Sequence, residues 1–243
     1  DVCVGGGNTS NNASNDPQTG AMVEKIAATF DKLHGLLIGP GLGRHPGVFS
    51  AVKDILALAR SKGNMPIILD ADALFLVASE PEIVQSFRTV VLTPNVREFN
   101  RLWQSVFSKK HHSDDARALE PDTSPDGVAH LANEMGNCTI VLKGAHDIIS
   151  NGITTVVCRA RGGNRRSGGQ GDILAGCISV AVIWATRFGE GTSSNIDAAC
   201  AACHVVKLAQ CMAFNEKRRS MTAPDVIECI GPAFQQLFPS EAV

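Results

Sequence analysis

The chain has 243 residues, of which 44% are hydrophobic and 19% charged, and its formal net charge is −2. This length fits one large α/β domain or two small ones, and the composition is that of a globular protein with a hydrophobic core. Lysine and arginine are scattered along the chain, which argues against a nucleic-acid-binding surface. We therefore expect small-molecule partners and no nucleic acid.

The eight cysteines lie mostly within apolar patterns, which predicts buried thiols in a reducing compartment rather than a disulfide framework. Cys200 and Cys203 have CxxC spacing, but no second Cys or His pair accompanies them at zinc-site spacing, so we interpret them as helical core. No signal peptide is visible, and the longest apolar run ends before a bilayer-spanning length. These features predict a cytoplasmic or mitochondrial protein that is not secreted and has no membrane partner.

The chain begins with Asp1 and a polar stretch, which predicts a flexible N-terminal remnant over residues 1–20 and a single folded domain over residues 21–243. Short apolar runs of the kind found in strands buried on both faces alternate with helical patterns. The predicted strands are 35–39, 65–69, 89–92 and 138–142, and the predicted helices between them are 46–61, 96–107 and 124–135. This alternation predicts a mostly parallel sheet with helices on both faces.

Asn151-Gly152 is a strong hairpin signal between 147–150 and 154–158, so we expect an antiparallel edge there. Three helices are expected after the hairpin: 173–185, which we interpret as buried, then 194–214 and 223–237. The polar segment 108–124 is predicted to be a surface loop, with His111 and His112 in solvent.

Distinctive residue clusters follow each predicted parallel strand, at the edge of the sheet where open α/β folds bind ligands. They are 39–44, 70–72, 93–98 and 143–144. Asp70 and Asp72 could cap the next helix, or one of them could reach a cation. Asn95 and Glu98 lie one helical turn apart, so they could hold Mg²⁺ through water, while capping by Asn95 is equally compatible.

A glycine-rich run ends at Asp172 and is followed directly by the predicted helix 173–185. Glycine amides and a helix N-terminus together form an anion-binding site, which predicts phosphoryl transfer with Asp172 as the base. The alternative is that Asp172 only caps the helix. Lys143, Arg165 and Arg166 suit a polyphosphate, although a lysine at a strand end can also simply extend to solvent. No GxxxxGK[ST] segment is present, so a Walker loop is excluded.

Six segments together resemble the ATP- or ADP-dependent NAD(P)H-hydrate dehydratase family of the ribokinase-like superfamily. They are GPGLGR, DADAL, TPNVREFNRL, LKGAHDIIS, RRSGGQGD and RSMTA, in that order over about residues 35–238. The resemblance implies a ribokinase-like three-layer α/β/α sandwich with a mostly parallel sheet and an antiparallel edge. It also implies that the chain dehydrates hydrated NADH or NADPH at the expense of ATP, releasing ADP and phosphate. The GGQGD motif resembles that of the eukaryotic branch, which implies ATP as the phosphoryl donor.

The resemblance assigns roles to three sets of residues. Asp172 would be the catalytic base and would also contact the substrate. The other substrate-binding residues would be Gly41, Gly43, Asn95, Val96, Arg97, Glu98, Phe99, Asn100 and Arg101. ATP would contact Lys143, Gly144, Ala145, His146, Asp147, Gly162, Gly163, Asn164, Arg165, Arg166, Ser167, Gly168, Gly169, Gln170 and Gly171. Asn95 and Glu98 would position Mg²⁺ through water.

The chain departs from the family pattern in two ways. Relatives begin with a further strand and a helix bearing a YxGA-type segment that has no match here, so we expect this segment to be lacking. Arg218 stands where relatives often have glycine. Two alternatives to the dehydratase therefore stay open: a ribokinase-like kinase of a vitamin precursor, and a truncated nucleotide-binding protein without catalysis. A homo-oligomer is also open, because relatives assemble.

Overall fold

The computed structural model describes residues 17–239, except 64, 86, 88, 111–119 and 189–192. Its centre is a six-stranded sheet whose spatial order follows the chain from β1 to β6. The strands are β1 (Leu36–Ile38), β2 (Ile67–Leu69), β3 (Val90–Leu92), β4 (Thr139–Leu142), β5 (Asp147–Ser150) and β6 (Thr155–Cys158). The first four strands are parallel and the last two antiparallel, which confirms the predicted sheet and its hairpin edge.

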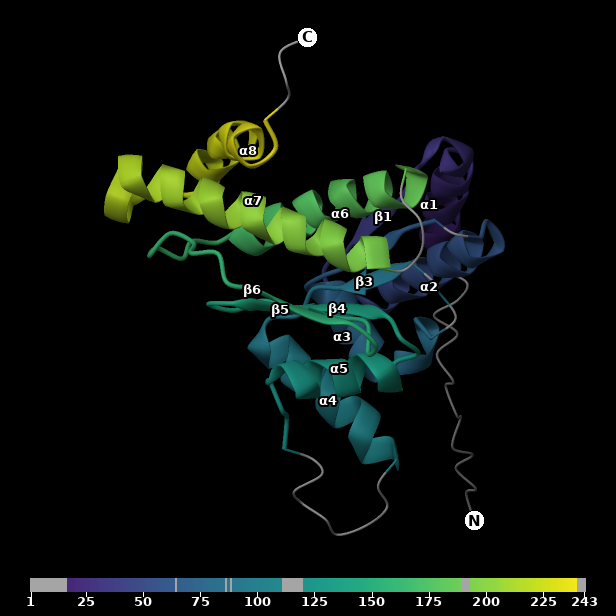
Figure 1. Cartoon of the computed structure of the whole chain (residues 1–243). Coiled ribbons are helices and arrows are strands. Elements are labelled where there is room, and N and C mark those ends of the chain that lie inside the picture. The colour runs from purple at the N-terminus through teal and green to yellow at the C-terminus, as the bar shows by residue number, and fades with distance from the viewer. Residues whose placement is uncertain are drawn as a thin grey trace, which may run out of the picture.

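Helices cover both faces of the sheet, so the molecule has three layers (Figure 1). The helices α2 (Pro46–Ser61), α3 (Asp72–Ser79), α4 (Val96–Lys110) and α5 (Pro125–Glu134) lie on one face, and α6 (Gln170–Phe188) and α7 (Ser193–Lys217) on the other. The period-two alternation of the strands divides the core: Ile67 and Leu69 pack with the first group, and Ile68 packs with α6 and α7. Outside these layers, α8 (Ala223–Leu237) packs on α7, and α1 (Pro17–Ala27) packs on α2.

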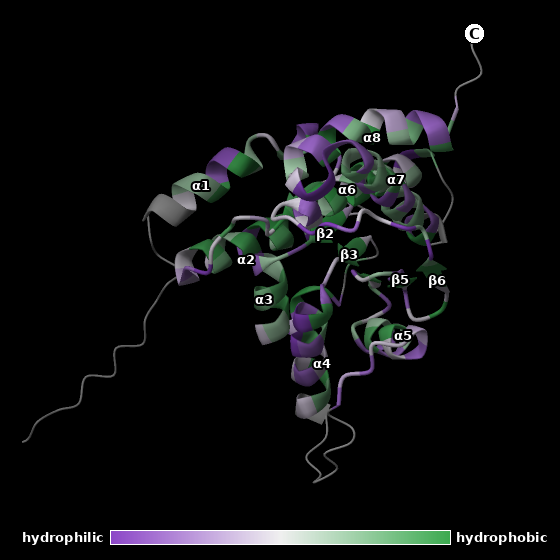
Figure 2. Ribbon diagram, turned by 90° about the vertical axis from the view of Figure 1, so that its left-hand side faces the viewer, coloured by the Kyte–Doolittle hydropathy of each residue, from purple (hydrophilic) through white to green (hydrophobic). Residues whose placement is uncertain are grey.

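The helices on the first face begin at local sequence signals. The ring of His45 accepts a hydrogen bond from the amide of Gly47 at the start of α2, and Pro46 fits the first turn because it needs no donor there. Ser124 caps α5 in the usual way, with its hydroxyl accepting from Gly127. Figure 2 shows α4 green along one side and purple along the other, which is the amphipathic pattern of a helix on a core.

One expectation for α4 needs correction, and two others fall outside the described residues. The helix α4 continues to Lys110, inside the segment predicted as a loop, and His111 and His112 lie outside the described residues. Residues 1–16 of the expected N-terminal remnant lie outside the described residues, so the boundary expected at residue 20, which is within α1, stays a prediction. Arg218 has φ 53°, a conformation that favours glycine, the residue with which the family resemblance contrasts it at this position.

The helix α6 was expected to be buried, but only one side of it is. Leu174, Ile178 and Val182 pack against the sheet, whereas Val180 is 47% and Trp184 51% exposed. The outward side therefore lines an apolar groove with α7 and α8, of about 760 Å³. The helix was predicted too short, because its apolar residues continue to Phe188 on a side that the sheet does not cover.

Two segments, Gln170–Phe188 and Asn195–Ser220, are long and apolar enough to cross a membrane, contrary to the expectation that no run reaches that length. Length and composition alone do not distinguish a membrane span from the core helix of a soluble protein. Both helices pack on the same face of the sheet, where Ile178 and Cys203 belong to one core cluster. Core packing therefore explains the apolar residues of α6 and α7 that face the sheet.

The loop that follows β1 requires glycine at position 39, where φ is +129° and an added Cβ would lie 1.7 Å from the carbonyl oxygen of Asp70. We predict that Gly39→Ala lowers the free energy of unfolding by about 3 kcal/mol or more, measured by urea denaturation. Gly63→Ala is the matched control, because Gly63 also has positive φ (+89°) but an added Cβ would meet nothing within 4 Å. It should cost about 1 kcal/mol, and equal losses in the two variants would contradict the account.

Candidate active site

The residue clusters that follow the parallel strands meet at one edge of the sheet, as predicted. The ammonium of Lys143, after β4, lies 2.7 Å from Oδ1 of Asp70, after β2. The backbone amide of Lys143 donates to the carbonyl of Pro94, after β3, at 2.8 Å. This ion pair is mostly withdrawn from water, because the side chains of Lys143 and Asp70 are 17% and 2% exposed.

Asp70 and Asp72 were considered as helix caps, but neither caps α3. The N-cap position is Ala71, whose backbone has the unusual conformation φ 49°, ψ −116°. Asp72 instead accepts from the amide of Gly43 at 3.0 Å and from Nε of Arg44 at 2.6 Å. Asp70 and Asp72 therefore bind the residues of two different loops, the loop after β4 and the loop after β1.

The start of α4 is a capping box, which confirms the capping interpretation of Asn95. Oδ1 of Asn95 accepts from the amides of Arg97 and Glu98, and Oε2 of Glu98 accepts from the amide of Asn95 at 2.8 Å. Burial raises the pKa of Glu98, opposed by the hydrogen bond from Asn95 and the charge of Lys143. A partly buried carboxylate such as that of Glu98 fits Mg²⁺. Oδ1 of Asn95 already accepts two hydrogen bonds, so a contact between Asn95 and the ion would pass through a water molecule.

The glycine-rich run lies beside these residues, at the N-terminus of α6. A Cβ added to Gly171 would lie 3.6 Å from Nζ of Lys143, so the ammonium lies close to the first helical turn. Gly169 has φ +86°, and its carbonyl accepts the amide of Ile173. Asp172 is exposed in this first turn. The first amides of α6, the helix dipole and Lys143 together favour an anion at this place.

A pocket of about 610 Å³ opens at this point, next to the helix N-terminus. Most residues predicted to bind ATP line it: Lys143, Gly144, Ala145, His146, Asp147, Gly162, Gly163, Asn164, Arg166, Ser167, Gln170 and Gly171. Asn95 lines it as well. Gly168 and Gly169 lie outside the lining, in the same loop. Nε of Arg165 donates to the carbonyl of Met221 at 3.0 Å, so this side chain links its loop to the segment before α8.

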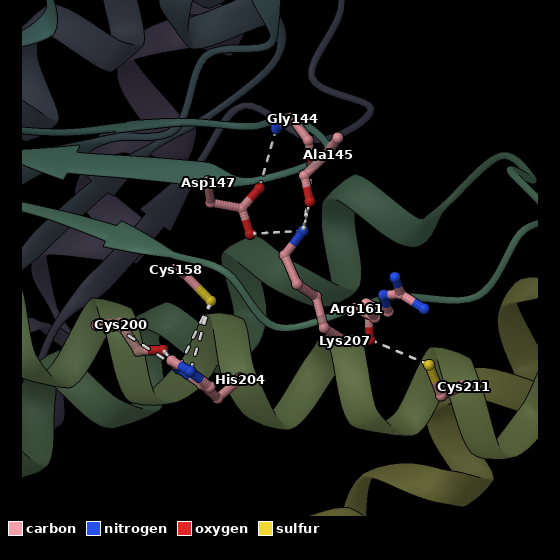
Figure 3. A network of polar contacts seen from close by, with 9 residues as sticks. All are labelled: Gly144, Ala145, Asp147, Cys158, Arg161, Cys200, His204, Lys207 and Cys211. Atoms are coloured by element: carbon pink, nitrogen blue, oxygen red, sulfur yellow. Dashed lines mark hydrogen bonds and ion pairs between the residues drawn. The ribbon is translucent and has the colours of Figure 1, made fainter. Parts of the chain in front are cut away.

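Lys207 is a pocket residue that the sequence interpretation missed. It lies on α7, and its ammonium contacts Oδ2 of Asp147 at 3.2 Å and the carbonyls of Gly144 and Ala145 (Figure 3). The other oxygen of Asp147 accepts the amide of Gly144 at 2.9 Å. Lys207 and Asp147 therefore hold the turn after β4 in place, and the carboxylate of Asp147 is occupied by this role. Lys207 lies among apolar residues in the predicted helix 194–214, so its charge was the only signal in the sequence that could have marked it as a pocket residue.

The residues predicted to contact the substrate are divided by burial. Phe99 is 0% exposed and packs in the core beside Trp103, so it supports α4 from below rather than lining the surface. Arg97 and Val96 are exposed, whereas Asn100 is partly buried, with its Oδ1 unbonded.

The guanidinium of Arg101 lies 5.1 Å from the ring of Phe75, and that of Arg44 lies 4.7 Å from the same ring. Gly41 and Gly43 have positive φ and open space where a Cβ would stand. The loop after β1 therefore offers open backbone at Gly41 and Gly43, and the guanidinium groups of Arg44 and Arg101 lie together at the ring of Phe75.

Cysteines border the pocket on the side of α7. Cys203 lines it, and burial raises the pKa of this thiol. Cys158 is different, because a hydrogen bond from the Cys200 thiol lowers its pKa to about 6, against the effect of burial. The seven cysteines in the part of the chain that the structure describes are all free. Cys138, Cys158 and Cys203 are buried as predicted, whereas the other four are only partly buried.

The comparisons with known proteins agree with this architecture. The chain is 39% identical over 220 residues to ATP-dependent (S)-NAD(P)H-hydrate dehydratase of Mus musculus, and 38% identical to that of Homo sapiens. Each match covers 89% of this chain, which spans 62% and 61% of the length of these relatives.

Solved structures with this fold include hydroxyethylthiazole kinase of Pyrococcus horikoshii and a ribokinase-like superfamily protein of Enterococcus faecalis. Both are 20% identical to the chain, with TM-scores of 0.63 and 0.60. The matches cover 87% and 88% of this chain, and 75% and 67% of those chains. They show that the three-layer sandwich is ribokinase-like.

A family model, Carb_kinase, described as NAD(P)H-hydrate dehydratase, matches residues 4–232. The match includes every segment that forms the pocket and the helix N-terminus beside it. The chain therefore belongs to the NAD(P)H-hydrate dehydratase family.

Proposed function

We propose that this chain catalyses the ATP-dependent dehydration of hydrated NADH and NADPH, which restores NAD(P)H and releases ADP and phosphate. One observation carries the proposal within this family: Lys143, the N-terminus of α6 and the capping box of α4 converge on a single pocket. An ammonium, a row of backbone amides and a carboxylate suited to Mg²⁺ are the parts that phosphoryl transfer requires.

The nucleotide would occupy the 610 Å³ pocket, with its phosphates directed toward Gly171 and Lys143. Arg166 lines the same pocket and can pair with a phosphate oxygen. The turn at Gly144 and Ala145 presents main-chain groups that Lys207 holds in one arrangement. A fixed arrangement lowers the entropy cost of binding, because little has to be ordered when the nucleotide arrives.

The damaged cofactor would lie on the other side of the Asp70–Asp72 turn, against the loop after β1. Gly41 and Gly43 leave the backbone open to close approach by a ligand. Arg44 and Arg101, at the ring of Phe75, would pair with the pyrophosphate of the dinucleotide. Phe99 would act only indirectly, by supporting α4 from the core.

In the reaction we propose, the carboxylate of Asp172 takes the proton of the ring hydroxyl as its oxygen attacks the γ-phosphorus of ATP. The bond between the β- and γ-phosphates breaks and ADP leaves, while the amides of residues 169–172 stabilise the charge on the transferred group. The ring C–O bond then breaks with loss of inorganic phosphate, and loss of a neighbouring ring proton restores the dihydropyridine. Phosphate is a far better leaving group than hydroxide, which explains why a dehydration consumes ATP.

Asn95 and Glu98 would hold Mg²⁺ through water at the mouth of the pocket. When bound there, the ion would neutralise charge on the phosphates. The raised pKa of Glu98 supports this assignment, because burial leaves its carboxylate short of compensating positive charge.

We predict that Asp172→Asn lowers the rate of NADH recovery about 10²- to 10⁴-fold, because the amide cannot accept the proton. The assay incubates the chain with hydrated NADH and Mg²⁺-ATP and follows the absorbance of the restored dihydropyridine. ATP affinity, measured separately by calorimetry, should change by less than about threefold, since the amide donors of the helix remain. Unchanged recovery in the variant would contradict the role of Asp172.

The same assay distinguishes the alternatives to a dehydratase. A phosphorylated product that accumulates without restored NADH would indicate a small-molecule kinase. ATP binding without any turnover would indicate a nucleotide-binding protein without catalysis. The proposal requires ADP, phosphate and NADH to appear in equal amounts.

We predict that Lys207→Met lowers the free energy of unfolding by about 3–5 kcal/mol, because it leaves the carboxylate of Asp147 buried without its partner. The side chains of Lys207 and Asp147 are only 9% and 4% exposed, so water cannot replace the lost contact. The double variant Lys207→Met/Asp147→Asn should recover part of this loss in urea denaturation. A loss below about 1 kcal/mol in the single variant would show that the pair does not hold the turn.

A further inference from the structure

Outside the proposed active site, Cys158, Cys200 and His204 gather where the hairpin edge of the sheet meets α7 (Figure 3). Their potential ligand atoms, two sulfurs and a ring nitrogen, all lie within 4.8 Å of one another. Among the described residues, this is the set of His, Cys, Asp and Glu side chains whose geometry could hold a metal ion. The three residues lie within the family match, but the proposed reaction gives none of them a role.

Two rigid elements position the three side chains. Cys200 and His204 are four residues apart on α7, so they project from the same face of the helix. Cys158 ends β6 and is held in register opposite Asp147 of β5. Ligands on a helix and a paired strand need little ordering when an ion binds, which favours binding over the same residues in a loop.

One ring nitrogen of His204 faces both sulfurs of the cluster. Its Nδ1 lies 3.5 Å from Sγ of Cys158 and 3.7 Å from Sγ of Cys200, whereas Nε2 is 3.9 Å from Sγ of Cys158. Nδ1 also lies 2.9 Å from the carbonyl oxygen of Cys200, a contact that is given up when Nδ1 binds an ion and the ring proton is carried by Nε2.

The spacing fits a small tetrahedral ion. Zinc bonds of about 2.3 Å to sulfur and 2.0–2.1 Å to nitrogen place two neighbouring ligand atoms about 3.6–3.8 Å apart. Nδ1 of His204 lies 3.5 Å and 3.7 Å from the two sulfurs, so shifts of a few tenths of an ångström at most bring these ligands to a shared ion. Two thiolates and an imidazole favour zinc over Mg²⁺ or Ca²⁺, which prefer oxygen.

The neighbouring Cys203 does not belong to this cluster, although it completes a CxxC with Cys200. Its side chain is 0% exposed and lines the 610 Å³ pocket instead. Cys200 and His204 are only partly buried, so an ion can reach them from solvent. Both cysteines lie on α7 as expected, Cys203 within the core cluster and Cys200 packed against it at a partly buried position.

We propose that Cys158, Cys200 and His204 form a Zn²⁺ site that fastens the end of β6 to α7, with water in the fourth position. On binding, each thiol releases its proton to solvent and its sulfur bonds the ion, with no change of oxidation state. The site lies directly beside the proposed nucleotide pocket. Cys158 precedes the pocket loop that begins at Ala160, and Lys207 follows His204 by about one turn of α7.

The test titrates the fully reduced, metal-free chain with Co²⁺ and then with Zn²⁺. We expect one equivalent of Co²⁺ to produce the thiolate charge-transfer band and the intense d–d bands of a tetrahedral site, and Zn²⁺ to abolish both. Saturating Zn²⁺ should also raise the melting temperature by about 5–10 °C, since the ion binds only the folded arrangement. Each readout is independent of any enzymatic activity.

Cys200→Ser and His204→Gln each remove one ligand at a partly buried position, so both variants should fold, as checked by circular dichroism. Each should weaken Zn²⁺ binding by about 100-fold or more and remove the tetrahedral cobalt spectrum. Cys229→Ser is the matched control, because Cys229 is another free, partly buried cysteine, on α8 and outside the cluster. It should bind Zn²⁺ as the unchanged chain does.

Three results would overturn the proposal. The first is a weak octahedral cobalt spectrum in the unchanged chain. The second is equal zinc affinity in Cys200→Ser and Cys229→Ser. The third is a Cys158–Cys200 disulfide, found by mass spectrometry in oxidised protein, together with no retention of zinc by the reduced chain.

Discussion

The parallel register of β1 to β4 is the constraint on which the rest of the structure depends. Because Leu36, Ile67 and Val90 are aligned across neighbouring strands, the chain leaves all these strands at the same edge. That alignment brings Asp70 to Lys143, although 73 positions separate them along the chain. Lys143 in turn lies against the first turn of α6, so the register of short apolar strands determines where a phosphate is favoured.

Buried charge is concentrated around this edge, and each buried group has a defined partner. Asp70 pairs with Lys143, and Asp147 pairs with Lys207 and with the amide of Gly144. Such pairs contribute little net stability compared with apolar packing, but removing one partner is costly. Their effect is therefore to fix the geometry of the turn after β4, which suits the alignment of donor and acceptor that the proposed reaction needs.

Features encoded locally were predictable from the sequence, and those that depend on distant contacts were not. Local signals determine where three segments begin or turn: Pro46 for α2, the capping box at Asn95 for α4, and Asn151-Gly152 for the hairpin. The helices α2 and α4 and the hairpin edge were therefore anticipated. The burial of Phe99 depends on which side of α4 meets the sheet. The role of Lys207 depends on its contact with the turn at Gly144, which is 63 positions away in the sequence. Cys158 and His204 are likewise 46 positions apart, so the CxxC spacing could not reveal their contact. The cellular location, the oligomeric state and the division into domains stay predictions.

The central claim is that ATP binds with its phosphates at the N-terminus of α6. A crystal structure of the chain with Mg²⁺ and a non-hydrolysable ATP analogue tests this most directly. The account predicts the triphosphate between Lys143 and the loop 162–171, with the γ-phosphate on the amides of residues 169–172 and within reach of Asp172. A nucleotide bound elsewhere, such as in the apolar groove between α6 and α8, or with phosphates that contact neither Lys143 nor these amides, would contradict it.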